Sequence, residues 1–231
     1  MPTRFYFQDA LVTATGAYPG GTQSGVTADV TDAGAATMRR MLTSHDSSVK
    51  QVSIATAATA SQQSAYLRTF VSDPLAAQTI RNFNYGVTEY FGDANSEDAL
   101  AANFWASCIA AYVWRPSAGS LVGWLSTPTA SLFNTRPTGG EPQSTAGTYE
   151  MLSNTKPAAG SVTCQTGDVI IVEVWAQFTQ DDAASHNGFF FYGGSTDPTF
   201  NHQTTSSAAS YIEFPDTLLL NPDTLFAQSC M

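Results

Sequence analysis

Three glutamates, Glu89, Glu173 and Glu213, have the residue type that acid–base chemistry requires, and each falls on a predicted strand. Glycoside hydrolysis needs two carboxyl groups that face each other across a cleft. Pairing among these three is conceivable. Their surroundings favour structural roles, in which Glu173 and Glu213 border a sheet face or neutralise a nearby arginine. We therefore expect no catalytic residues and a protein that is not an enzyme.

The serines and glycines form no recognisable catalytic or cofactor motif. A serine hydrolase holds its nucleophile on a strained GxSxG turn, and neither Gly119-Ser120 nor Gly193-Gly194-Ser195 matches that pattern. The sequence also contains no phosphate-binding loop and no dinucleotide-binding fingerprint. We expect no bound cofactor.

A polar group that could bind a metal surrounds the aromatic segment FFFY at 189–192. Carboxylates in the loops of β-sandwiches often bind Ca²⁺, and here two histidines accompany them. The residues are Asp181, Asp182, His186, Asp197 and His202. Their spacing matches no ligand motif, so a plain polar loop is the favoured interpretation and we predict no metal site.

Four tryptophans could serve either recognition or packing. Exposed aromatic side chains on a sandwich stack on sugars, which would make the protein a lectin-like module, whereas buried ones fill the core. The residues are Trp105, Trp114, Trp124 and Trp175. All four lie in strongly apolar segments, so core packing is expected. Their abundance also suits a subunit interface.

The element that must position several of these residues is the segment Gly167–Gln177, GDVIIVEVWAQ. Its β-branched and aromatic residues favour a strand. Alternation divides such a strand into two faces. One carries Ile170, Val172 and Val174, and the other carries Val169, Ile171, Glu173 and Trp175. We expect a central strand that is fully buried on the first face and partly buried on the second.

Further strands and turn signals fill the rest of the chain. Strands are predicted at 3–8, 49–57, 66–72, 78–91, 103–115, 120–126, 189–192 and 211–214, with weaker signals at 37–43 and 148–152. The segment 93–102 is the best candidate for a short helix. This pattern predicts an all-β protein, an antiparallel β-sandwich of jelly-roll type with one short helix and long loops.

The chain divides into three parts within what we expect to be one domain. Residues 1–60 form an N-terminal arm with the first strands, and the arm itself is the Gly- and Ala-rich stretch 13–36. Residues 61–220 form the sandwich core. Residues 221–231 form a C-terminal tail.

Composition excludes several classes of partner. The net charge is −10, from 19 acids against 9 bases, so no basic face for nucleic acid is expected. The one adjacent pair of bases, Arg39-Arg40, is expected to be solvated or ion-paired. No apolar run approaches the roughly 20 residues that span a bilayer, and no signal peptide is recognisable. We expect synthesis in the cytoplasm, and no membrane contact.

Three cysteines at wide spacing suggest neither a disulfide framework nor a metal knuckle. They are Cys108, Cys164 and Cys230. We expect free thiols made in a reducing cytoplasm, with Cys108 as a small core residue.

From residue 66 onward, the order of motifs resembles a family of bacteriophage virion structural proteins with a β-sandwich domain. The resemblance extends over about residues 1–220, and the order of its motifs carries it. The motifs are LRTFVSDPLAAQTI at 67–80, the acidic-alanine segment 93–102 before the strand 103–115, SAGSLVGWL at 117–125, GDVIIVEVWA at 167–176, and GFFFYGG at 188–194 with SYIEF at 210–214. MRRML at 38–42 fits as well.

This resemblance implies a structural protein of a tailed-phage particle without enzymatic activity, and it supplies no catalytic residues. We expect a capsid decoration or cement protein located in the virion, a homo-oligomer that docks on major capsid or tail proteins. Residues 1–35 are the expected docking part. The alternative is a tail accessory or host-attachment protein that acts as a carbohydrate-binding module. An enzyme acting on polysaccharide is the third hypothesis. The acidic, lysine-poor composition agrees with a particle component released by lysis.

Overall fold

The computed structural model describes a chain built of strands and loops. It describes residues 2–12, 16–23, 27–32, 34, 37–55, 63–80, 87–95, 104–125, 150–156, 161–179, 187–196 and 209–221. None of these residues is helical, which confirms the all-β class predicted from the sequence. No helix able to cross a membrane is found among them.

Fourteen strands follow one another along the described chain. They are β1 (Thr3–Leu11), β2 (Val30–Thr31), β3 (Arg39–Leu42), β4 (Val49–Ala55), β5 (Gln63–Ser72), β6 (Gln78–Ile80), β7 (Val87–Asn95), β8 (Phe104–Arg115), β9 (Ser120–Trp124), β10 (Glu150–Lys156), β11 (Val162–Cys164), β12 (Val169–Thr179), β13 (Asn187–Gly193) and β14 (Tyr211–Phe214).

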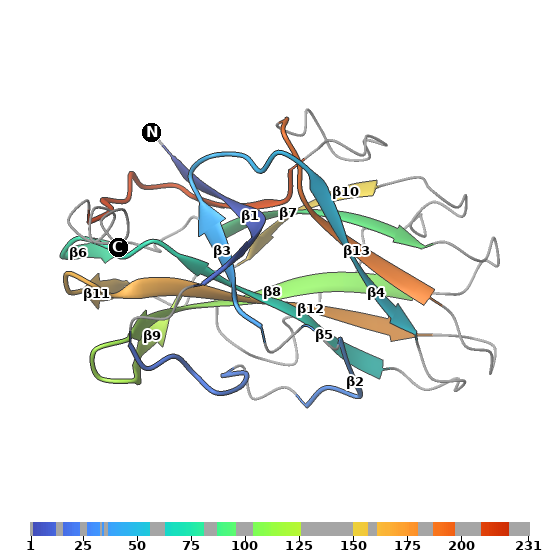
Figure 1. Cartoon of the computed structure of the whole chain (residues 1–231), viewed down its shortest axis with the longest axis horizontal. Coiled ribbons are helices and arrows are strands. Elements are labelled where there is room, and N and C mark those ends of the chain that lie inside the picture. The colour runs from blue at the N-terminus through green and yellow to red at the C-terminus, as the bar shows by residue number, and fades with distance from the viewer. Residues whose placement is uncertain are drawn as a thin grey trace.

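Twelve of these strands form one sheet in the order β4-β13-β7-β14-β1-β3-β5-β12-β8-β9, with β10 beside β7 and β2 beside β5. β6 and β11 form a separate pair. All neighbours are antiparallel except β2 and β3, which run parallel to β5, so the sheet is mixed. The seven strands from β4 to β5 curl into a half-barrel (Figure 1). The opening of the half-barrel lies between β4 and β5, the first and last of these seven strands. Cα atoms of β4 come within 8 Å of those of β2 and β5, so the two sides of this opening lie close together.

The strand β12 lies between β5 and β8, as its apolar alternation predicts. Ile170, Val172 and Val174 join the main core, and this first face is fully buried. Side chains from both halves of the curled sheet meet in this core. For example, Phe7 of β1 stacks on Phe70 of β5 with ring centroids 4.3 Å apart.

The second face of β12 is also fully buried, which corrects the expectation of partial burial. Ile171 and Trp175 are no more than 1% exposed. The cause is the arm, defined here as the described residues of the segment 12–38 between β1 and β3, which lie over the outer face of the sheet. Tyr18 and Met38 pack on the outer cluster around Ile171. Backbone hydrogen bonds tie the arm down along its length: Ala17 N to Pro116 O at 3.0 Å, Asp29 N to Ser64 O at 2.8 Å, and Asp32 N to Tyr66 O at 3.1 Å.

One local prediction was wrong, and another is only partly described. The short helix expected at 93–102 is strand at its first three residues, because the backbone there pairs with β13 on one side and, at Asp93, also with β10. Residues 96–102 lie outside the described chain. Of the long strand expected at 78–91, the described residues form β6, which pairs with β11, and the first part of β7, which belongs to the main sheet. Residues 81–86 lie outside the described chain. The hairpin of 103–115 with 120–126 is confirmed as β8 and β9.

Cys164 on β11 is a free, buried thiol, as the sequence predicts. The side chain of Cys108 and all of Cys230 lie outside the described residues. Burial, together with the nearby charge of Asp168, raises the pKa of Cys164 to about 11. Because the thiolate is the reactive form, we expect iodoacetamide at pH 8 to label Cys164 at least roughly tenfold more slowly in the folded protein than in urea. Peptide mass spectrometry measures both rates, and equal rates would contradict this environment.

Candidate functional site

Glu173 is a buried carboxylate on the outer face of β12, beneath the arm, and it is only 1% exposed. Its Oε1 accepts hydrogen bonds from the backbone N–H of Gln23 at 2.6 Å and from the Tyr112 hydroxyl at 3.1 Å. Its Oε2 accepts from the indole N–H of Trp175 at 3.3 Å. A buried charge is costly unless such donors surround it. The arm, β8 and β12 each supply one donor, so Glu173 links the arm to the sheet.

The two tyrosines beside Glu173 are held in their neutral form. Burial, and then the charge of Glu173 and the hydrogen bond to it, raise the pKa of Tyr112 well above its usual value. Burial also raises the pKa of Tyr66 to about 12. Both hydroxyls therefore keep their protons near neutral pH. In this state Tyr112 acts as a hydrogen-bond donor to Glu173 and not as a base.

A small pocket of about 120 Å³ lies between the arm and the sheet. Its lining residues are Pro19, Gly20, Gly21, Met38, Tyr66, Thr69 and Tyr112. A water molecule needs about 10–15 Å³ of such space, so the pocket has room for several waters or one small organic group. The arm residues form one wall, so the pocket exists only while the arm is packed on the sheet.

Glu173 and Glu213 are too far apart to act as a carboxylate pair. Glu213 on β14 pairs with Arg4 on β1, which is the role expected of it from the sequence. Core residues flank each of these glutamates, Ile212 and Phe214 beside Glu213 and Val172 and Val174 beside Glu173. The two carboxyl groups therefore lie on the outer faces of two layers that pack about 10 Å apart. Glycosidases place their two carboxyl groups about 5–10 Å apart. The side chain of Glu89 lies outside the described residues, although its backbone pairs with Ile212 in register.

The other candidates from the sequence are placed only in part. Trp114 and Trp175 are buried, as predicted, and Trp124 is half-buried against the outer clusters. The side chain of Trp105 lies outside the described residues. The polar group around FFFY lies there too: Asp181, Asp182, His186, Asp197 and His202. Within the described part of the chain, no three His, Cys, Asp or Glu residues gather in a way that could hold a metal ion.

Sequence reasoning gave Asp168 no separate role and missed its ion pair. Asp168 is 1% exposed, and its carboxylate accepts hydrogen bonds from Nε and Nη2 of Arg115, each at 2.8 Å. The backbone N–H of Gln165 donates to the same carboxylate at 2.8 Å. Gly167 takes a φ of +94°, which glycine adopts without strain. Together these contacts fix the turn that leads into β12 against the end of β8.

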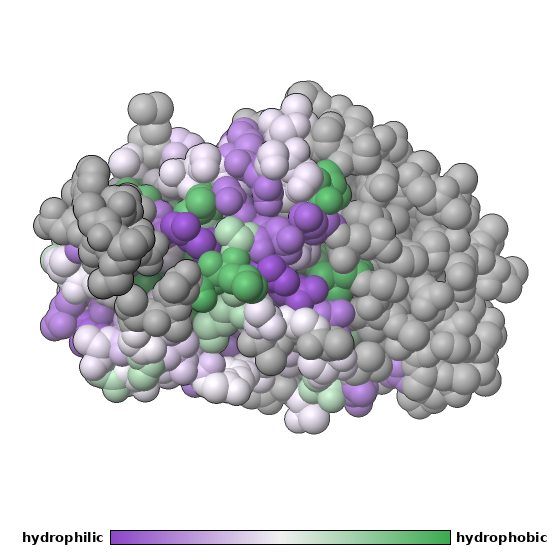
Figure 2. Space-filling model, viewed as in Figure 1, coloured by the Kyte–Doolittle hydropathy of each residue, from purple (hydrophilic) through white to green (hydrophobic). Residues whose placement is uncertain are grey.

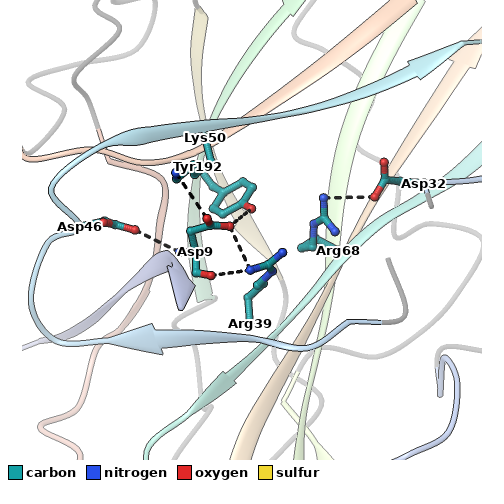
Figure 3. A network of polar contacts seen from close by, with 7 residues as sticks. All are labelled: Asp9, Asp32, Arg39, Asp46, Lys50, Arg68 and Tyr192. Carbon is teal, nitrogen blue, oxygen red and sulfur yellow. Dashed lines mark hydrogen bonds and ion pairs between the residues drawn. The ribbon is translucent and has the colours of Figure 1, made fainter. Parts of the chain in front are cut away.

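A second polar cluster, missed by sequence reasoning, fills the opening of the half-barrel (Figure 3). We call it the mouth network and define it as Asp9, Asp32, Arg39, Asp46, Lys50, Arg68 and Tyr192. Asp9 is its centre. Its carboxylate lies 3.2 Å from Arg39 Nη1 and 3.4 Å from Lys50 Nζ, and it accepts a 2.8 Å hydrogen bond from the Tyr192 hydroxyl. Arg68 pairs separately with Asp32 at 3.1 Å. The contacts of Asp9 join β1, β3, β4 and β13, and the pair between Arg68 of β5 and Asp32 lies beside them (Figure 3).

Asp9 should make the protein sensitive to acid. Burial by itself would raise the pKa of Asp9, but the hydrogen bond from Tyr192 and the charges of Arg39 and Lys50 outweigh it and lower the pKa below 3.8. A carboxylate whose pKa is lowered in the folded state adds stability above its unfolded pKa, and this stability is lost as the pH falls through the folded pKa. We expect the wild type to lose stability below about pH 4 and Asp9→Asn to lose less. Urea unfolding measured from pH 6 to pH 3 checks this; parallel curves for the two proteins would contradict it.

The geometry beneath the arm favours a structural role for Glu173, because its carboxylate accepts hydrogen bonds from three donors of the same chain. Arg39 and Arg40 each form an ion pair, with Asp9 and Asp73 respectively, as expected from the sequence. A scan against models of protein families and a search of curated proteins found no match to this chain.

Proposed function

We propose that this chain is a structural component of a bacteriophage virion, a capsid decoration or cement protein that docks on neighbouring subunits. The order of motifs that resembles such proteins supports the proposal. In the fold, four of those motifs coincide with strands and their turns: 67–80 covers most of β5 and all of β6, 117–125 covers a turn and β9, 167–176 begins β12, and 188–194 covers most of β13. The proposal includes location in the virion and assembly as a homo-oligomer.

A jelly-roll arrangement of the sheet belongs to the same proposal. Its support is the common core, which receives side chains from β1, β13 and β14 on one side and from β5, β8 and β12 on the other. Two layers facing one core is the arrangement that a sandwich requires. The strands that form these layers are continuous in one curled sheet.

The observation that carries the proposal is the use of Glu173 as a structural anchor. The best-buried candidate for acid–base chemistry accepts three hydrogen bonds from its own chain and holds the arm on the sheet. A polar side chain used in this way rigidifies a fold when its hydrogen bonds are satisfied. A rigid β-protein with its glutamate committed to internal contacts suits a particle subunit better than a polysaccharide-cleaving enzyme.

Residues 1–35 remain the proposed docking part, but deleting them would not test docking. The strand β1 lies between β14 and β3, and Phe5 and Phe7 are fully buried in the core. Removing β1 would unfold the sheet. Within this region, the exposed turn at Gly20-Gly21 is the better candidate, because a Cβ at either position would meet nothing within 4 Å. A partner could therefore approach the backbone there.

Single substitutions at this turn test docking without disturbing the fold. Purified chain is added to particles that lack it, and bound protein is measured after sedimentation. We expect saturable binding of the wild type, and at least roughly tenfold weaker binding of Gly20→Trp and Gly21→Trp with unchanged melting temperature. Gln165→Trp, at an exposed residue in another turn, is the matched control and should bind normally.

The outcomes separate the hypotheses. Wild-type protein that does not bind particles would overturn the decoration role and leave the host-attachment module, which glycan binding by the isolated protein would then test. Normal binding of both glycine variants would move the docking surface away from the arm. The buried positions of Trp114 and Trp175 give no support to a sugar-stacking surface at those residues.

A further inference from the structure

The mouth network contains more hydrogen-bond donors than its own chain satisfies. Within the described residues, three buried side-chain N–H groups have no partner, and all three belong to this network: Nε of Arg39, and Nε and Nη1 of Arg68. The Arg68 side chain is only 8% exposed. An unpaired buried donor is destabilising, and folded proteins pair about nine in ten of such groups. The two arginines therefore have N–H groups left over for an acceptor from outside these contacts.

The carboxylates of the mouth network are already committed to other donors. Asp9 is shared by Arg39, Lys50 and Tyr192. The Oδ2 of Asp32 forms an ion pair with Arg68 Nη2, and it also accepts a 2.8 Å hydrogen bond from the backbone N–H of Gly34. Asp46 accepts from the backbone N–H groups of Asp9 and Ser47. None of these contacts reaches the three unpaired N–H groups.

Solvent reaches the rim of the network, whereas its three unpaired N–H groups are buried. Arg39 on β3, Lys50 on β4 and Arg68 on β5 stand at the opening of the half-barrel, where β4 comes near β2 and β5 without pairing with either. Figure 3 shows the side chains of Arg39 and Arg68 on the same side of the network, beyond Asp9. The Arg39 side chain is 21% exposed and that of Lys50 is 42% exposed, so solvent reaches the rim. Figure 2 shows hydrophilic residues gathered over β1, β3 and the start of β4 on this face, with apolar residues beside them.

We propose that Arg39 and Arg68 form a binding site for a single oxyanion, with Lys50 and Tyr192 at its rim. The planar guanidinium group matches the oxygen atoms of carboxylates and phosphates, and such charge-assisted hydrogen bonds are short and strong. Three cations and three carboxylates already balance within the network, so a group of low charge fits the site better than a polyanion. The net charge of −10 on the whole chain also disfavours a polyanion. The ligand is a small carboxylate or phosphate, either free or carried on a partner.

Titration of the full chain with two probes tests this site. Inorganic phosphate and acetate are each titrated by calorimetry at pH 7, with NaCl holding the ionic strength constant. We expect saturable one-to-one binding of at least one probe to the wild type, and at least roughly tenfold weaker binding to the double variant R39Q/R68Q. Arg4→Gln, which removes an arginine paired with Glu213 elsewhere in the sheet, is the control and should bind as the wild type does. Tighter binding of phosphate or of acetate identifies which oxyanion the site takes.

Arg68 is buried, so its substitution could also disturb the fold. The single variant Arg39→Gln, at a more exposed side chain, provides an independent reading and should weaken binding in the same direction. Crystals of the wild type grown with selenate give a second, structural test, because bound selenium is located by its anomalous scattering. An anomalous peak between the two guanidinium groups is expected. The proposal is overturned by the absence of saturable binding, by equal binding to wild type and R39Q, or by water alone between the arginines in the selenate crystals.

Discussion

Glu173→Ala lowers the free energy of unfolding by about 4 kcal/mol, which is the largest effect of a polar substitution that we expect in this protein. The substitution leaves the backbone N–H of Gln23, the Tyr112 hydroxyl and the Trp175 indole without their common acceptor. Each is a donor held between the arm and the sheet. The loss also loosens the arm at Gln23, so we expect the outer face of β12 near Trp175 to become more accessible. Urea unfolding followed by tryptophan fluorescence measures both the stability and the change around Trp175.

Two controls separate the buried contacts from charge alone. Glu173→Gln keeps an acceptor oxygen and most of the shape, so its loss of stability should be about half that of the alanine variant. Glu213→Gln removes a carboxylate from a partly exposed pair with Arg4 and should cost no more than about 1 kcal/mol. Equal, small effects of all three substitutions would show that Glu173 does not anchor the arm.

Asp168→Ala lowers the free energy of unfolding by about 3 kcal/mol. Removing this carboxylate leaves the Arg115 guanidinium without its paired acceptor and frees the backbone N–H of Gln165. Since Asp168 fixes the entry of β12 beside the end of β8, we also expect faster amide exchange at the start of β12. Denaturant unfolding and hydrogen exchange provide the two readings.

The matched control is another aspartate–arginine pair in the same sheet. Asp73→Ala breaks the pair with Arg40, whose side chain is 30% exposed, and should cost no more than about 1 kcal/mol. A cost for Asp168→Ala as small as that for Asp73→Ala would contradict the role given to the buried pair. Unchanged exchange at Val169 and Ile170 would contradict its role in fixing the turn.

Residue alternation in the sequence predicted the central strand β12 well. The alternation of Ile170, Val172 and Val174 predicted β12 and its core face, because period-two burial is written directly into residue order. The same pattern underestimated the burial of Ile171 and Trp175. The arm that covers them is rich in glycine and small polar residues, and nothing in its composition says which surface it lies on.

The two polar sites depended on contacts that local sequence cannot supply. Arg115 and Asp168 are 53 residues apart, and Tyr192 and Asp9 are 183 residues apart. Their pairing follows from strand order, which patterns of single residues do not determine. The error at 93–95 has the same origin: an acidic, alanine-containing segment favours a helix locally, and pairing with two neighbouring strands overrides that preference.

Immunogold electron microscopy of purified phage particles, with antibody raised against this chain, tests the proposed function most directly. The proposal predicts label distributed over the head, and peptides of this chain in the mass spectrum of the particles. Label confined to the tail or its tip would contradict the decoration role and favour a tail accessory or host-attachment protein. Absence of label, together with absence of the chain from the particle mass spectrum, would contradict a place in the virion altogether.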